Sequence, residues 1–170
     1  MKVFGIILLV LVLAVAGVYV DGARLPYNHS VSVTGVVPAP PDKVFAIITN
    51  VVKGPDWRPA VKSVNVLQPD QGRDHWVEHL NYGQFMTFLA IRTEPPTRRE
   101  VQLEDPNASY GGTWTYELLP APDPTTTTLR ITETGFIKPP LYRFVMAHVV
   151  GSTHNLDQYM TDIQAAASKP

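Results

Sequence analysis

Residues 75–92, HWVEHLNYGQFMTFLAIR, decide the fold of this chain, because their first five residues permit two incompatible structures. HWVEH matches the H-x-x-E-H signature of one class of zinc peptidase, in which His75 and His79 lie on one face of a helix. On a strand the two histidines are about 13 Å apart, which is too far for both to bind one zinc ion. The secondary structure of this segment therefore decides between a metal site and a sheet.

The flanking sequence favours the strand. His75–Tyr82 and Phe85–Arg92 are β-rich runs separated by Gly83-Gln84, a spacing typical of a hairpin. An isolated helical turn would interrupt the sheet at this point, so we predict a strand here and no metal site. Five further runs alternate apolar and polar residues with a period of two, which predicts strands at residues 29–37, 62–67, 99–103, 113–119 and 125–137. With the two strands of the hairpin, the prediction is seven strands in all.

The composition indicates one globular domain and excludes several classes of function. A chain of 170 residues with 45% hydrophobic content can bury one core but not two. The net charge is −1 and Lys and Arg form no cluster, so the chain has no basic surface to neutralise phosphates and we predict no binding of nucleic acid. Because the chain has no cysteine, disulfides, thiolate nucleophiles and cysteine-based zinc sites are excluded.

The first twenty residues differ in kind from the rest. Residues 3–20, VFGIILLVLVLAVAGVYV, contain no charged side chain, and 13 of these 18 are Val, Leu, Ile or Phe. As a helix they span about 27 Å, close to the roughly 30 Å of the hydrocarbon core of a bilayer. We predict a transmembrane segment over residues 1–22, with Lys2 on the cytoplasmic side and the chain from Asp21 onward exported.

Two fates remain open for this segment. Ala14-Val15-Ala16 matches the A-x-A pattern of a signal-peptide cleavage site, so the segment is either a permanent single-pass anchor or a signal whose removal leaves a secreted protein. Residues 21–27, DGARLPY, contain Gly, Pro and charges of both signs, which is typical of a linker. We therefore expect a linker over residues 23–27, followed by a domain of residues 28–170.

Helical patterns flank the strands. Residues 41–49 predict a helix, and residues 50–59 a broken second helical segment. The period changes after Pro139-Pro140, since Leu141–Ala167 contains no proline and carries a stripe at helical spacing, which predicts one long helix. Gly151 in its middle is unfavourable in a helix and indicates a bend or a close contact.

This order of elements resembles the helix-grip fold of the START and polyketide cyclase/dehydrase (SRPBCC) superfamily, which includes the birch-pollen-allergen type. VVPAPPDKVF (36–45) resembles the family's opening strand and first helix, and PDWRP (55–59) the W-x-P after its second helix. GGTWTYEL (111–118) with TLRITE (128–133) resembles its late hairpin. The resemblance covers about residues 28–167 and implies an α+β fold, in which a seven-stranded curved antiparallel sheet surrounds a long C-terminal helix and leaves a cavity between them.

The residues that would face such a cavity include several polar groups. Alternation places Trp114 and Tyr116 on the helix side of the sheet, together with Glu133 and Glu78. A packed core would not select carboxylates, because a buried charge must be paired or neutralised, whereas a ligand cavity uses a few polar anchors in an apolar wall. The candidate ligand-binding residues are Trp76, Glu78, Tyr82, Trp114, Tyr116, Glu133, His148, Ser152 and Tyr159, and no catalytic residue is assigned.

Each polar candidate also has a structural interpretation. Glu78 can lie in water at the open end of the sheet, and Glu133 can pair with Arg92 or Arg130 at an edge. His148 can be a hydrogen-bonded histidine of the core. These alternatives stay open at the level of the sequence.

Three classes of function follow. The first is a membrane-tethered or exported protein that binds a hydrophobic small molecule or lipid, in line with the ligands of the superfamily it resembles. The second is a cyclase- or hydratase-type enzyme with Glu78 or Glu133 as base and His148 or Tyr116 as acid. The third is a scaffold for other envelope proteins, for which the sequence offers no distinct exposed apolar patch. The chain has no Ser-His-Asp spacing, phosphate loop or metal-ligand set, so we predict no cofactor.

Overall fold

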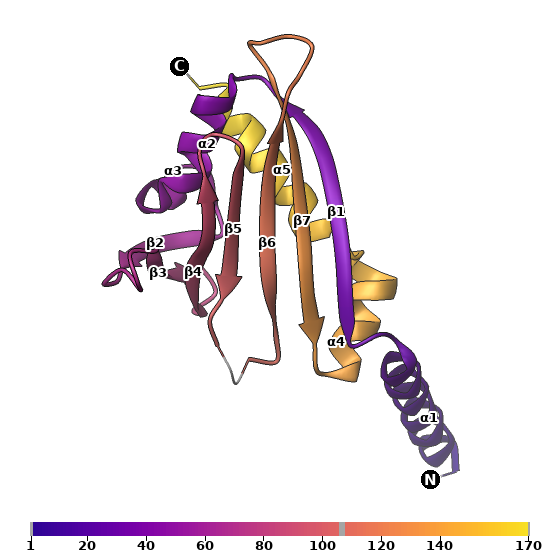
Figure 1. Cartoon of the computed structure of the whole chain (residues 1–170). Helices are drawn as coiled ribbons and strands as arrows, with labels where there is room; N and C mark the ends of the chain where they lie inside the picture. The colour runs from indigo at the N-terminus through magenta and orange to yellow at the C-terminus, as the bar shows by residue number, and fades with distance from the viewer. Residues whose placement is uncertain (1, 106–107, 170) are drawn as a thin grey trace.

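The structure, a computed structural model, describes residues 2–105 and 108–169. Seven antiparallel strands form one sheet in the order β1-β7-β6-β5-β4-β3-β2, and it curves around the helix α5 (His154–Ala167) (Figure 1). This is the α+β helix-grip architecture that the sequence predicted, with all seven strands present. The strands are β1 (Asn28–Val37), β2 (Val61–Val66), β3 (His75–Leu80), β4 (Phe85–Glu94), β5 (Arg98–Leu103), β6 (Tyr110–Leu119) and β7 (Thr127–Ile137).

The segment HWVEHL is strand β3, as predicted. Its residues alternate between half-buried and buried positions, and it pairs with both β2 and β4. Gly83 takes φ = 85° in the turn to β4, a conformation that glycine adopts without steric cost. Along the strand, His75 Nε2 lies 3.0 Å from the Glu104 carboxylate, and His79 Nε2 lies 3.1 Å from the Asn65 amide nitrogen. The two histidines thus have separate partners.

The core forms where the inner face of the sheet meets α5 and α2 (Pro41–Thr49). Leu156 and Ile163 of α5 are buried together with Leu129 and Ile131 of β7. Along the chain, two short helices, η1 (Val51–Lys53) and α3 (Gly54–Trp57), connect α2 to β2, where the sequence predicted a broken helical segment. Burial of alternate strand residues against one helix is the physical reason that the period-two pattern predicted this sheet.

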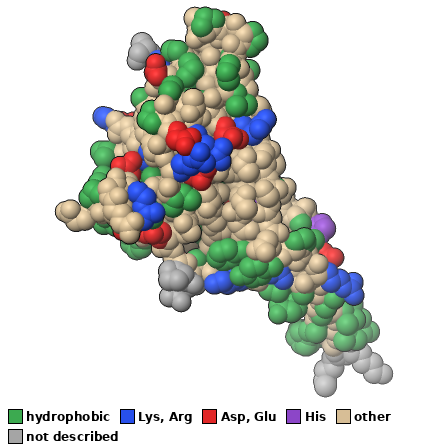
Figure 2. Space-filling view, in the orientation of Figure 1, with side chains coloured by type: hydrophobic (Ala, Val, Ile, Leu, Met, Phe, Trp, Pro, Cys, Tyr) green, Lys and Arg blue, Asp and Glu red, His purple; other side chains and the backbone are tan. Residues whose placement is uncertain are grey.

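The outer face of the sheet is polar. Arg98 donates hydrogen bonds of 2.7 Å to Glu100 and to Glu117, and Arg92 pairs with Glu94 on the same face. Figure 2 shows acidic and basic side chains gathered in one patch on this side of the molecule. Glu117 faces outward, as expected from the alternation that places its neighbour Tyr116 on the helix side.

The prediction of a single helix over residues 141–167 is wrong in one respect, because the helix is interrupted near Gly151. Helix α4 (Pro140–Val145) continues into a π-helical turn, η2 (Met146–Val150), and ends at Gly151, which has φ = 94°. A positive φ is costly for residues other than glycine, so the break is encoded at this position. As a result α5 lies on the sheet, while α4 turns toward the N-terminal helix (Figure 1).

The N-terminal helix α1 (Lys2–Arg24) extends away from the sheet (Figure 1). It is long and apolar enough to cross a membrane, and the side chains of its apolar window are not buried inside the protein. The helix continues to Arg24, two residues into the segment expected as a linker. Its last turn is stabilised by α4, since Arg143 Nε donates to the Gly22 carbonyl at 2.9 Å and His148 Nε2 lies 2.9 Å from Asp21 Oδ2.

Candidate ligand cavity

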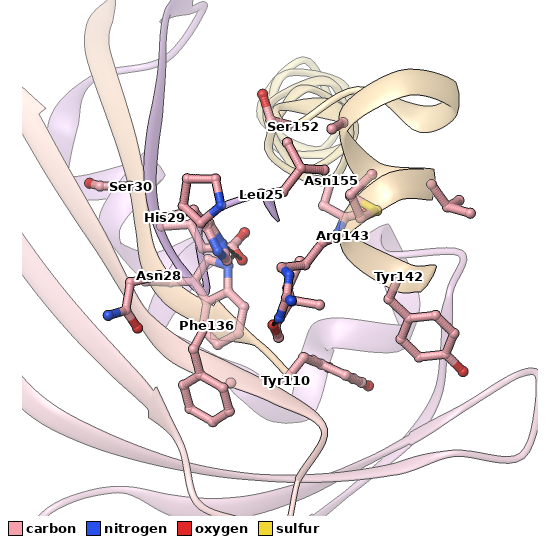
Figure 3. A pocket seen from close by; sticks show the side chains of 18 residues that line it. Leu25, Asn28, His29, Ser30, Tyr110, Phe136, Tyr142, Arg143, Ser152 and Asn155 are labelled. Carbon is pink, nitrogen blue, oxygen red and sulfur yellow. Dashed lines mark hydrogen bonds and ion pairs between the residues drawn. The ribbon is translucent and has the colours of Figure 1, made fainter. Parts of the chain in front are cut away.

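A cavity of about 560 Å³ lies between the sheet and α4, on the side of the molecule where α1 ends (Figure 3). Its volume is typical of a small-molecule site. The break at Gly151 creates this space, because α4 departs from the sheet that α5 continues to cover. Its walls come from the start of β1, the start of β6, the end of β7 and the segment of α4 and η2.

Most of the wall is apolar. Leu25 and Pro26, which follow α1 directly, line one side, and Val145 and Met146 line another. Phe136 of β7 also lines the cavity, and its ring stacks on Tyr27 with 5.6 Å between ring centroids. Such a wall favours a ligand with a large apolar surface, because its burial removes that surface from water.

The polar part of the wall includes a hydrogen-bonded group of His29, Trp114 and Glu133. His29 Nε2 lies 3.1 Å from Glu133 Oε1, and Trp114 Nε1 donates to Glu133 Oε2 at 3.2 Å. All three side chains line the cavity, and the carboxylate is 16% exposed. This group can orient a ligand hydroxyl or amine by hydrogen bonding, and an imidazole beside a carboxylate can also move a proton.

Arg143 fixes the helical side of the cavity. Its guanidinium donates to the backbone carbonyls of Gly22, Ile137 and Lys138 at 2.9, 3.0 and 2.7 Å. Figure 3 shows this side chain reaching inward from α4. Because one arginine binds the end of α1, the end of β7 and the loop before α4, it ties together the three segments that frame the cavity.

The structure distributes the nine sequence-predicted residues over three places. Trp114, Glu133 and Ser152 line the cavity. Trp76, Glu78, Tyr116 and Tyr159 lie in the packed core. Tyr82 and His148 lie outside both.

The core group is closed by its own contacts rather than open to a ligand. Arg58 of the loop after α3 donates to Glu78 at 2.7 Å, and Trp76 Nε1 donates to the same carboxylate oxygen at 3.3 Å. The guanidinium also lies over the Tyr159 ring, 4.5 Å from its centroid. The inward direction predicted for Glu78 is therefore confirmed, and its partner is an arginine whose side chain is 17% exposed.

Tyr116 and Tyr159, the two tyrosines of this core group, hydrogen-bond to each other. Burial is the main cause that raises the pKa of Tyr116 well above its ordinary value, and the neighbouring Tyr159 raises it further. Burial likewise raises the pKa of Tyr159, although Arg58 opposes the effect. Both hydroxyls are held protonated inside the core, where they satisfy each other.

Tyr82 and His148 were predicted to face the cavity, and neither lines it. Strand β3 ends at Leu80, so Tyr82 lies in the turn and is 70% exposed. His148 lies on the π-helical turn, which ends the regular helical stripe, and its ring contacts Asp21 of α1 and the Phe144 ring. The directions of these side chains were predicted from the period of a regular strand or α-helix. Residues outside such an element do not follow that period, so the prediction failed for both.

The sequence patterns did not indicate a role for His29, Arg58 or Arg143. His29 has the same parity as Val31 and Val33 on β1, so alternation could have placed it on the inner face beside Glu133. Arg58 and Arg143 lie in or next to short helical segments, where no long period predicts a direction. Their partners lie at least 20 residues away in the chain, or are backbone carbonyls.

Comparison with known families identifies the fold's relatives. A family model described as polyketide cyclase/dehydrase and lipid transport matches residues 37–151. The chain belongs to this family. Among curated protein sequences, no significant match is found. The matched region includes Trp114, Glu133 and Arg143, whereas His29 lies before its first residue.

Solved structures with the same fold span nearly the whole domain. The Zhui aromatase/cyclase from Streptomyces sp. R1128 superposes with a TM-score of 0.65 at 17% identity, covering 82% of this chain and 93% of that one. A START superfamily protein from Mycobacterium smegmatis gives 0.64 at 18%, covering 82% and 97%. Norcoclaurine synthase from Thalictrum flavum gives 0.64 at 13%, covering 89% and 92%. At these identities the similarity demonstrates a common fold, including the START-like helix grip, and no common activity.

Proposed function

We propose that this protein binds a hydrophobic small molecule or lipid in the cavity between the sheet and α4, while α1 holds it at a membrane. The observation that carries this proposal is the cavity of about 560 Å³, whose largely apolar wall contains the hydrogen-bonded group His29–Glu133–Trp114. An apolar enclosure with a few directed polar atoms is the common design of small-molecule sites. The family description, which includes lipid transport, supports the same class of ligand.

The membrane part of the proposal is a retained anchor with the domain on the exported side. It is supported by the length and apolar character of α1 and by the position of Lys2 before its uncharged run. The alternative is a signal segment cut near Ala16, which would leave a secreted domain. The mass of the mature protein distinguishes the two outcomes, because cleavage removes the first residues.

Native mass spectrometry of the detergent-extracted full chain tests both parts at once. We expect the intact mass of the uncut chain together with a bound small molecule. Saturable binding of a fluorescent fatty acid or sterol then measures affinity. Val145→Trp should abolish binding because residue 145 lines the cavity, whereas Val149→Trp, on the same segment but 72% exposed, should leave it unchanged. No bound molecule and no saturable binding would refute the proposal.

A second candidate function is acid/base catalysis in the same cavity. The observation that favours it is the contact between His29 and Glu133, in which an imidazole and a carboxylate face a largely apolar space. Of the residues expected to act as base or acid, only Glu133 lies there. Chemical conversion of the molecule that copurifies, followed by mass spectrometry, tests this function: it should stop in Glu133→Gln even at a ligand concentration that saturates the variant.

A further inference from the structure

The wall of the cavity begins where the apolar part of α1 ends. The uncharged run stops at Val20, and Leu25 already lines the cavity. The helical residues between them, Asp21–Arg24, rise by about 6 Å at 1.5 Å per residue. The polar region on each side of a bilayer's hydrocarbon core is about 5–8 Å thick. In a bilayer that α1 spans, the cavity wall therefore starts at the level of the lipid headgroups.

The direction in which the cavity faces is fixed, because α1 is joined to the domain by a packed contact. Gly22 lies against the Pro140 backbone, where a side chain at position 22 would collide with the Pro140 carbonyl oxygen. Arg143 binds the Gly22 carbonyl, and His148 lies 2.9 Å from Asp21. A flexible linker would allow the domain to turn in any direction, whereas these contacts hold α4 beside the end of α1.

The surface around this junction has the composition of a membrane-facing surface. Tyr27, Leu141 and Tyr142 are each about half exposed, and Val149 is more exposed still. The cations Arg24 and Lys138 lie on the surface of the same region. Figure 2 shows hydrophobic and basic side chains adjacent to one another where the domain meets α1. Tyrosine is enriched at both interfaces between a bilayer and water, and lysine and arginine near the end of a membrane-spanning helix extend their charged groups to the interface.

We infer that the end of the domain formed by α4, η2 and the segment before β1 rests on the bilayer that holds α1, so that the cavity opens onto the lipid headgroups. This inference rests on the proposed membrane span of α1. It deepens the proposed function by naming the source of the ligand: a molecule dissolved in that leaflet reaches the cavity without crossing water.

Spin labels on single cysteines test the contact, and the chain suits this method because it has no cysteine of its own. The full chain is placed in nanodiscs of phosphatidylcholine and phosphatidylglycerol, with a nitroxide at position 149, 141, 52 or 11. Val52→Cys is the matched control for Val149→Cys, because both are exposed valines and position 52 lies on η1, beyond α2. Accessibility to oxygen, which concentrates in lipid, is compared with accessibility to a neutral nickel chelate, which stays in water.

We expect the ratio of oxygen to nickel accessibility to be severalfold higher at positions 149 and 141 than at position 52, and highest at position 11. A ratio at 149 and 141 equal to that at 52, with a lipid-like ratio at 11, overturns the inference and leaves the membrane span intact. A water-like ratio at position 11 overturns the span and the inference together. Ligand binding is measured separately, so its failure is distinguishable from either outcome.

Discussion

Glu133 of β7 and His29 of β1 are separated by 104 positions in the chain, yet their side chains meet at 3.1 Å inside the cavity. The antiparallel register brings them together, since Val31 lies opposite Glu133 and His29 opposite Gly135. Residues two apart on neighbouring strands share a face and are diagonal neighbours, within reach of long side chains. The polar group of the cavity is thus a direct consequence of how the first strand pairs with the last.

Glu133→Gln should weaken binding of a ligand that donates a hydrogen bond to this carboxylate. A hydrogen bond to a charged group contributes about 1.5–3 kcal/mol, so we expect roughly a tenfold or larger loss of affinity for a long-chain alcohol. The methyl ether of the same alcohol cannot donate this bond and should bind both proteins equally. Titration calorimetry with the two ligands makes the comparison. Glu117→Gln on the outer face is the control, and an equal loss for alcohol and ether would contradict the prediction.

Arg58→Met should destabilise the fold without affecting the cavity. The substitution leaves the Glu78 carboxylate buried without its cationic partner, and removal of one member of a buried pair costs about 3–5 kcal/mol. Arg98→Met breaks a pair on the outer face and should cost about 1 kcal/mol or less. Urea unfolding in detergent gives both values. The prediction is contradicted if the two variants lose equal stability or if Arg58→Met abolishes ligand binding.

Stability should fall steeply in alkaline solution because of Tyr116 and Tyr159. Burial raises the pKa of both hydroxyls above the ordinary value of 10.0. Above that pH the unfolded chain releases the two protons while the folded chain retains them, so the free energy of unfolding decreases as pH rises. Below it neither state releases them, and this contribution is constant.

Tyr116→Phe removes one of these groups and should reduce the slope. The loss corresponds to one proton, or at most about 1.4 kcal/mol per pH unit above the pKa of the unfolded tyrosine. Urea unfolding at a series of alkaline pH values, in detergent, measures the slope for both proteins. Identical slopes for the native protein and Tyr116→Phe would show that this hydroxyl does not contribute.

The sheet was predictable from the sequence because each strand buries one face. Trp76, Glu78 and Leu80 alternate with less buried residues on β3, and Leu129 and Ile131 do so on β7. A shift of one residue would expose the whole buried set, so the period of two carries strong information on secondary structure and direction. It therefore also predicted correctly that Glu133 faces inward.

The position of the cavity was less predictable, because it depends on a break and on a distant contact. The sequence shows that Gly151 is unfavourable in a helix, but the new direction of α4 depends on Gly22 and Asp21, more than 100 positions earlier. Likewise, Glu78 is charged and buried because Arg58 approaches it from a different element. Pairings of this kind depend on tertiary packing, and the local periodicity of the sequence carries no information about which distant residues meet.

Gly22→Val should loosen the contact between α1 and α4. No side chain fits at position 22 against the Pro140 carbonyl, whereas a side chain at Gly17 of the same helix meets no atom within 4 Å. Overpacking of this kind costs about 1–3 kcal/mol, and relief requires α1 to move away from α4. Hydrogen exchange of the full chain in nanodiscs should therefore become faster at the amides of residues 141–150.

Gly17→Val is the matched control, because it introduces the same β-branched residue into the same helix and should leave this exchange unchanged. Equal exchange in the two variants would show that the last turn of α1 does not hold α4. In Gly22→Val, the spin label at position 149 should also become more accessible to the nickel chelate, since α4 would no longer be held beside the bilayer. Loss of the packed contact with no change at position 149 would mean that the exposed apolar residues hold the surface to lipid without help from α1.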